Sequence, residues 1–267
     1  MLKRINSYSL IIITFILIIL SILPEITDAT ARVEPSKFIF TLKPGERITD
    51  AIKVTNTQDI EAEFTAIIYD WTLDSQDRLV TFEAGSREDT LKGLIKFNPQ
   101  RFKLAPGQSQ YVRFTLSAPK KGEWLERKGI IFFEQELPSL TNEIGATIVT
   151  QIGTTVYLSF TETIHAFRFS GARVDLVEGH PPTAILDLVN QGQAHIRYQI
   201  AYKIVNESGT LLYEDSLGEQ IILPSSRRLL SFPLIDQIAP GKYNLLIEAS
   251  FVGTTEKFNT VVPFTAL

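Results

Sequence analysis

The chain has 267 residues, and its 26 Lys and Arg against 30 Asp and Glu give a formal net charge of -4. This balance argues against a nucleic-acid-binding protein, because such proteins carry a basic face or domain. The absence of cysteine excludes disulfide bonds, a thiol nucleophile and a thiolate metal site. The length suits one large domain or two of ordinary size, and a hydrophobic content of 44% is enough for packed cores.

The N-terminal segment has the layout of a secretory signal peptide. A Lys-Arg pair at positions 3 and 4 precedes the apolar run LIIITFILIILSIL at 10–23, which is short for a membrane span. The tripeptide Ala-Thr-Ala at 29–31 then places small residues where signal peptidase reads them. We therefore predict a signal peptide over residues 1–31 and export through the Sec pathway. An uncleaved N-terminal anchor is the alternative.

Most later apolar segments alternate with a period of two residues, which is typical of half-buried β-strands. Clear examples are YVRFTL (111–116), IRYQIAYKI (196–204) and YNLLIEASF (243–251). Pro-Gly turn signals separate such segments, in KPGE, APGQ and APGK. These patterns predict an all-β fold of sandwich or barrel type, in two domains over residues 32–162 and 163–267.

Residues that could perform catalysis are few and scattered. The histidines are His165, His180 and His195. Since no two of them have metal-ligand spacing, we expect polar surface roles for all of them. Asp70, Asp74 and Asp77 lack the pattern of a calcium-binding loop, so we interpret them as solvated loop charge. No nucleophile elbow, phosphate-binding glycine loop or HExxH motif occurs, and we predict a protein that is not an enzyme, with no cofactor and no metal.

Two tryptophans, Trp71 and Trp124, could stack on sugars if they were exposed. Tryptophan buries a large apolar area, so we expect both to pack in or against a core instead.

Five sequence blocks occur in an order and spacing that point to one family. They are RVEPSKFIFTLKPGE (32–46), DAIKVTNTQDIEAEFTAIIYDW (50–71), FNPQRFKLAPGQSQYVRF (97–114), RKGIIFFEQELP (127–138) and IGATIVTQIGTTVYLSF (144–160). Together they resemble the N-terminal domain of the periplasmic pilus-assembly chaperones, the PapD-like family. The second domain resembles a divergent immunoglobulin- or fibronectin-like sandwich. The two resemblances together imply two tandem immunoglobulin-like β-sandwich domains after the signal peptide.

The resemblance implies a mode of binding. Chaperones of this family lend an edge strand to a subunit whose own sandwich is incomplete, which is β-augmentation. A basic pair in the family holds the C-terminal carboxylate of the subunit. Lys37 best matches the first cation, whereas Thr155, or Thr154 if the register slips by one residue, stands at the position of the second. The implied subunit-binding residues are Lys37, Ala146, Ile148, Thr150, Ile152 and Thr155.

The strand expected over 144–158 has an apolar row at its even positions. Val156 and Leu158 should pack in the core of the first domain, and the N-terminal part should be a free edge. Natural proteins usually block such an edge with charge, proline or a bulge, yet no charge or proline lies between Gly145 and Thr155. We interpret the edge as open to a partner and Gly153 as a bulge. A mobile capping loop or a self-paired edge in a dimer are the alternatives.

These observations predict a periplasmic chaperone or assembly factor for pilus, fimbrial or coat subunits. Its partners would be secreted β-rich pilus or surface-fibre subunits, with an outer-membrane usher as a further partner. The alternative is a non-catalytic structural or adhesive cell-envelope protein with two immunoglobulin-like modules.

Overall fold

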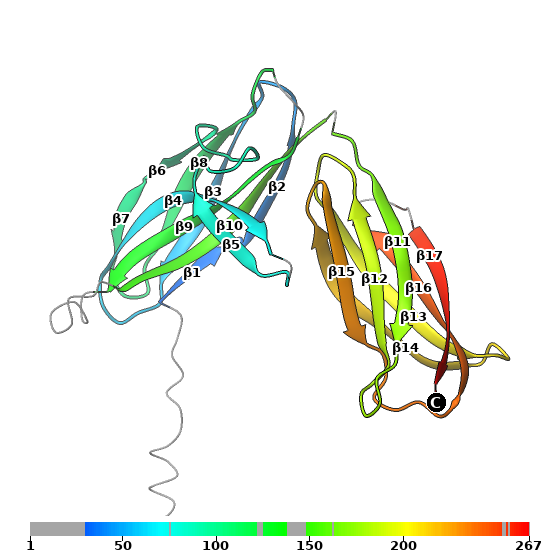
Figure 1. Ribbon diagram of the computed structural model, residues 1–267. Helices are drawn as coiled ribbons and strands as arrows, with labels where there is room; N and C mark the ends of the chain where they lie inside the picture. The colour runs from blue at the N-terminus through cyan, green and yellow to red at the C-terminus, as the bar shows by residue number, and fades with distance from the viewer. Residues whose placement is uncertain are drawn as a thin grey trace, which may run out of the picture.

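The computed structural model describes residues 30–74, 76–121, 125–137, 148–161, 163–252, 255 and 257–266. Every regular element in this part of the chain is a β-strand, and the strands form two elongated units that meet at one end (Figure 1). None of the described residues forms a helix that is long and apolar enough to cross a membrane. Residues 1–29 of the predicted signal peptide lie outside the described ranges, while Ala31 begins the first strand, and the signal peptide stays a prediction.

The first unit is a sandwich of two sheets. One sheet has the order β1-β3-β8-β6, and the other has the order β2-β10-β9-β4-β5, with β7 also paired to β4. Its strands are β1 (Ala31–Glu34), β2 (Lys37–Leu42), β3 (Arg47–Asn56), β4 (Ala62–Leu73), β5 (Leu79–Glu83), β6 (Ile95–Asn98), β7 (Arg101–Leu104), β8 (Ser109–Ser117), β9 (Arg127–Leu137) and β10 (Ile148–Phe160).

The second unit is a smaller sandwich, with sheets in the orders β11-β12-β15 and β14-β13-β16-β17. Its strands are β11 (Phe167–Asp175), β12 (Thr183–Asn190), β13 (Ile196–Asn206), β14 (Leu211–Ile222), β15 (Ser226–Pro233), β16 (Gly241–Phe251) and β17 (Lys257–Ala266). The predicted all-β class with two sandwiches is confirmed. The predicted boundary at 162/163 falls between β10 and β11 and stays a prediction.

Alternation in the sequence becomes alternation of burial. Val112, Phe114 and Leu116 of β8 are buried, while Tyr111 and Arg113 between and beside them are exposed. Burying each such side chain contributes about 1.5–3 kcal/mol, which is why register is specified so strongly. Between the sheets the ring of Phe114 meets Phe38 edge-on, with centroids 5.0 Å apart.

The predicted Pro-Gly turns at KPGE and APGQ are confirmed. Gly45 and Gly107 have φ of 77° and 70°, which is the left-handed region that side chains avoid. In the second of these turns, the Gln108 amide donates to the Ala105 carbonyl at 3.0 Å. The glycines therefore let the chain reverse without strain.

Both sandwiches use a buried asparagine to close the loop after a strand. Asn56 ends β3, and its amide donates to the carbonyls of Ile60 and Leu104 at 2.7 and 3.0 Å. Asn190 ends β12 and donates in the same way to Ala194 and Ile222 at 2.8 and 3.2 Å. Each side chain satisfies loop carbonyls that burial would otherwise leave unpaired.

An apolar cluster joins the two sandwiches. Trp71, Ile130 and Tyr157 of the first sandwich pack with Leu223 of the second. Trp71 is buried, so the expected core role of this tryptophan is confirmed. Trp124 lies outside the described residues. The contact fixes the strands that carry the cleft described below.

A buried carboxylate bridges the same interface. Glu126 accepts a hydrogen bond from Ser159 at 2.9 Å, and its Oε2 lies 2.5 Å from His195 Nδ1. His195 is buried, so the prediction of a surface role for it was wrong. The sequence could not show this burial, because it depends on how the second sandwich docks. Burial, followed by the negative charge of Glu126, raises the pKa of Tyr157, whose ring lies beside His195.

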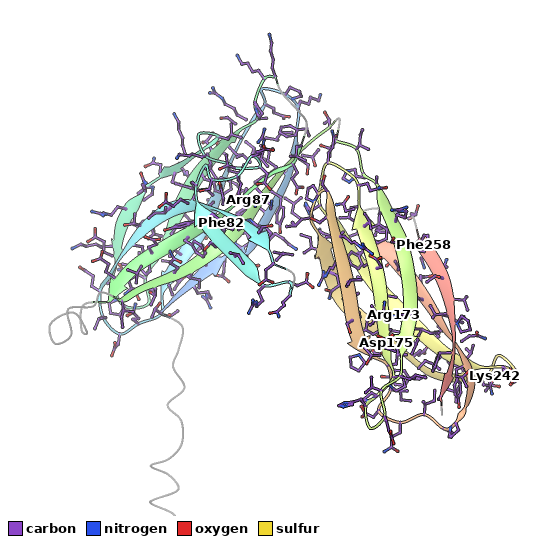
Figure 2. The ribbon with its side chains drawn as sticks, in the orientation of Figure 1. Phe82, Arg87, Arg173, Asp175, Lys242 and Phe258 are labelled. Atoms are coloured by element: carbon purple, nitrogen blue, oxygen red, sulfur yellow. The ribbon has the colours of Figure 1, made fainter. Side chains whose placement is uncertain are left out.

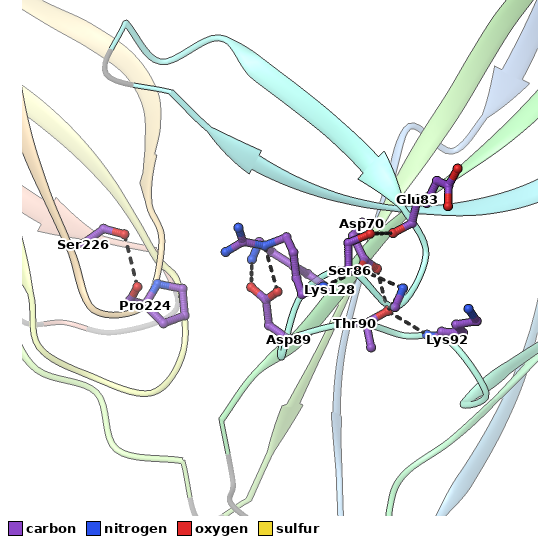
Figure 3. A network of polar contacts seen from close by, with 11 residues as sticks. Asp70, Glu83, Ser86, Asp89, Thr90, Lys92, Lys128, Pro224 and Ser226 are labelled. Atoms are coloured by element: carbon purple, nitrogen blue, oxygen red, sulfur yellow. Dashed lines mark hydrogen bonds and ion pairs between the residues drawn. The ribbon is translucent and has the colours of Figure 1, made fainter.

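Asp70 also differs from expectation, since it lies on β4 and is fully buried. Its carboxylate accepts hydrogen bonds from the amides of Gly85 and Arg87 at 2.8 and 3.0 Å and from the Thr90 hydroxyl at 2.5 Å (Figure 3). Asp70 therefore orders the segment after β5 rather than facing solvent. Asp77 keeps a partly exposed side chain and pairs with Arg228 of the second sandwich at 2.9 Å.

Candidate functional site

Strand β10 is flanked by strands on both sides over only part of its length. Strand β9 pairs with it antiparallel from Ile148 to Leu158, whereas β2 pairs with it parallel only from Thr155 to Phe160. Within the described part of the chain, residues 148–154 therefore pair with another strand on one side only, although β1 also approaches β10. We call this stretch the open half of β10, and residues 155–160 the covered half.

The open half presents backbone groups as well as side chains. In the covered half, the Thr155 amide donates to the Ser36 carbonyl at 3.1 Å, on the side away from β9. Since N–H groups alternate sides along a strand, those of Val149, Gln151 and Gly153 point the same way. They form a row of donors, with carbonyls between them, to which another strand could bond.

Side chains of the open half carry no charge. Ile148 and Val149 are 40% and 46% exposed. Ile152 is partly buried against the core of the first sandwich, and Thr150 accepts a hydrogen bond from the Thr30 hydroxyl at 3.3 Å. Ala146 and Ile144, which the sequence also places on this strand, lie outside the described residues. Val156 and Leu158 of the covered half are fully buried, as predicted.

Gly153 is not a bulge, and that prediction was wrong. It pairs with Phe132 of β9 in an unbroken register. A Cβ at this position would lie 2.7 Å from Phe132 Cδ1 and 2.9 Å from the Ile131 carbonyl oxygen. Glycine is therefore needed for close packing, and the open half keeps a regular register with β9.

The opposite edge of the same sheet is protected. Strand β5 is short, and the Arg87 guanidinium lies over the ring of Phe82, 5.9 Å from its centroid (Figure 2). Arg78 and Glu83 bracket its apolar residues with charge. Short length and flanking charge are ways in which proteins block edge pairing. The open half of β10 has neither device.

Lys37 and Thr155 are register partners across β2 and β10, so the structure brings these two sequence-predicted residues together. The ammonium of Lys37 lies 3.2 Å from Oε1 of Glu219, on β14 of the second sandwich. Arg197 of β13 binds the same carboxylate through Nε at 2.8 Å and through a terminal nitrogen at 2.5 Å. Hydrogen bonds from Arg197 and then Lys37 lower the pKa of Glu219 to about 2.

Arg197 and Glu219 are residues that the sequence did not single out. They lie 22 residues apart on neighbouring strands, and Lys37 is 182 residues from Glu219. The only signal was the charge alternation within IRYQIAYKI, which is also typical of any solvated strand.

Arg197 also borders an interdomain cleft of about 600 Å³. Its walls combine basic and apolar groups, among them His165, Lys257, Ile39 and Phe258. Such a surface suits an apolar chain segment that ends in an anion.

Ser159 and His195 of the cleft wall form a Ser-Glu-His constellation with Glu126, but its geometry is not that of a nucleophile and base. Ser159 and His195 both bond to the Glu126 carboxylate. In a nucleophilic triad the serine would instead bond to the second ring nitrogen of the histidine. The group is thus suited to joining the sandwiches.

Comparison with known proteins gives similar solved structures only. The chaperone CfaA of class 5 fimbriae is 15% identical, with 87% of this chain and 98% of that chain covered and a TM-score of 0.48. The CsuC-CsuE chaperone-tip subunit complex of Acinetobacter baumannii gives 16% identity, 88% and 98% coverage and a TM-score of 0.44. The Escherichia coli chaperone DraB is 12% identical, with 86% of this chain and 95% of that chain covered and a TM-score of 0.40. No family model and no curated protein matches the sequence.

Proposed function

We propose that this protein is an exported, non-catalytic chaperone or assembly factor that captures incomplete β-sandwich subunits of a pilus or other surface fibre. The observation that carries the proposal is the open half of β10, which offers a regular, uncharged edge near a cleft lined by basic and apolar side chains. A partner strand would complete the row of backbone bonds, and apolar side chains would fill the groove of the partner.

The end of β2 fixes where an added strand must stop. Because β2 occupies the outer side of β10 from Thr155 onward, a strand laid along residues 148–154 ends beside Lys37. If the added strand runs parallel to β10, its C-terminal end reaches the Lys37 ammonium. A terminal carboxylate there would gain a charge-assisted hydrogen bond. We therefore propose Lys37, Ala146, Ile148, Thr150, Ile152 and Thr155 as the residues that contact the subunit.

Replacement of Ile148 by Asp tests the proposal. We expect Ile148→Asp to abolish co-purification of the β-rich subunit that the parent captures on co-expression, because the partner groove would have to accept a desolvated charge. Val261→Asp is a matched control, since Val261 is 57% exposed on β17, an edge strand of the second sandwich. This control should fold and keep the subunit.

Circular dichroism and thermal unfolding show whether each variant folds. A folded Ile148→Asp protein that still captures the same subunit would contradict the proposal. That result would favour the structural or adhesive envelope protein instead.

A further inference from the structure

The second sandwich places a carboxylate of its own at the point where an added strand would end. Glu219 lies between Lys37 of β2 and Arg197 of β13 and is bonded to both. Arg197 donates two hydrogen bonds to the Glu219 carboxylate, which is the bidentate geometry that suits a carboxylate. The side chains of Lys37, Glu219 and Arg197 are 38%, 32% and 27% exposed, so an outside ligand can reach all of them.

We propose that Lys37 and Arg197 together form a carboxylate-binding site, that Glu219 fills it in the free protein, and that the carboxylate terminus of a captured chain must displace Glu219. The inference rests on the proposed function, because it assigns the second cation of the anchor and an internal competitor for it. Arg197 supplies from the second sandwich the positive charge that Thr155 does not supply from β10.

Glu219 competes by lowering the net positive charge of the site. With Glu219 in place, the two cations and one carboxylate leave a single net positive charge for an incoming anion. Neutralising Glu219 leaves two net positive charges. Exposed ion pairs are individually weak, so Glu219 can be displaced by a carboxylate that arrives on a strand already bonded to β10. The occupant would thereby disfavour free anions and lone chain ends relative to partners that also pair with the open half.

The same strand pair contains a control. Glu214 of β14 pairs with Lys203 of β13 at 3.1 Å, and both members of this ion pair belong to the second sandwich. Glu214→Gln therefore removes a cross-strand ion pair of the same kind without touching the proposed site. Any effect shared by Glu214→Gln and Glu219→Gln comes from general loss of charge.

The probe is a short fluorescent peptide of alternating isoleucine and threonine, prepared with a free C-terminal carboxylate and with a C-terminal amide. The parent should bind the free acid more tightly than the amide. Glu219→Gln should tighten the free acid by roughly two- to five-fold and leave the amide unchanged, which is the fold-change expected from one exposed ion pair. Lys37→Ala should remove the difference between the peptides, and Glu214→Gln should behave as the parent.

The outcomes separate the inference from the proposed function. If both peptides bind through Ile148 but Glu219→Gln leaves their affinity ratio unchanged, Glu219 only holds the sandwiches together and the inference is overturned while the function stands. If neither peptide binds the parent and the co-expressed subunit is also captured without need of Ile148, the proposed function fails and the inference fails with it.

Discussion

The two halves of β10 share one strand and one neighbour, β9, yet they face different surroundings. The covered half lies between β9 and β2, and Val156 and Leu158 fill the core of the first sandwich. The open half pairs with β9 alone within the described chain, and Ile148 and Val149 remain exposed. The difference arises from where β2 begins, at Lys37, and not from the composition of β10 itself. Apolar residues thus stabilise the fold in one half and are available to a partner in the other.

The largest expected loss of stability comes from a substitution in the covered half. Leu158→Ala should lower the free energy of unfolding by about 2–5 kcal/mol, because it leaves a cavity among fully buried side chains. Ile148→Ala in the open half should change it by no more than about 0.5 kcal/mol. Denaturant unfolding measures both. Equal losses for the two variants would show that Ile148 is also a core residue.

A smaller loss of stability is expected at Gly153, where the open half packs on β9. Gly153→Ala should destabilise the protein by about 1–3 kcal/mol, since the new methyl group would overlap the Phe132 ring and the Ile131 carbonyl. Gly171→Ala on β11 is the control, because nothing lies within 4 Å of a Cβ built there. A neutral Gly153→Ala variant would mean that β10 can move away from β9.

The alternation of apolar residues was sufficient to predict the strands and the burial of Val156 and Leu158. Five ordered blocks were sufficient to match Lys37 and Thr155 to the two positions of one basic pair, and the structure adds that they are register partners. The role of Glu219 was not predictable, since it requires the register of β13 on β14 and the docking of the second sandwich on β2. Burial of Asp70 and His195 escaped prediction for the same physical reason, because tertiary contacts decide whether a charged or titratable side chain is solvated.

The smallest expected loss of stability concerns the ion pairs of Glu219, beside the boundary between the two halves. The pKa of Glu219 is about 2 in the folded protein against an ordinary value of 4.5, so its ion pairs stabilise the fold above pH 4.5 and this contribution fades as the pH falls toward 2. Glu219→Gln should therefore cost under about 1 kcal/mol at pH 6, and less near pH 2. Thermal unfolding of both proteins at the two pH values checks this. A difference that grows on acidification would have the wrong sign.

Hydrogen exchange along β10, with and without the captured subunit, tests most directly whether the open half is the donor edge. In the free protein the amides of Val149, Gln151 and Gly153 should exchange quickly, whereas the Thr155 amide, bonded to Ser36, should be protected. Binding of the subunit should protect the first three amides and leave Thr155 unchanged. Continued fast exchange at Val149, Gln151 and Gly153 in a saturated complex would contradict the account.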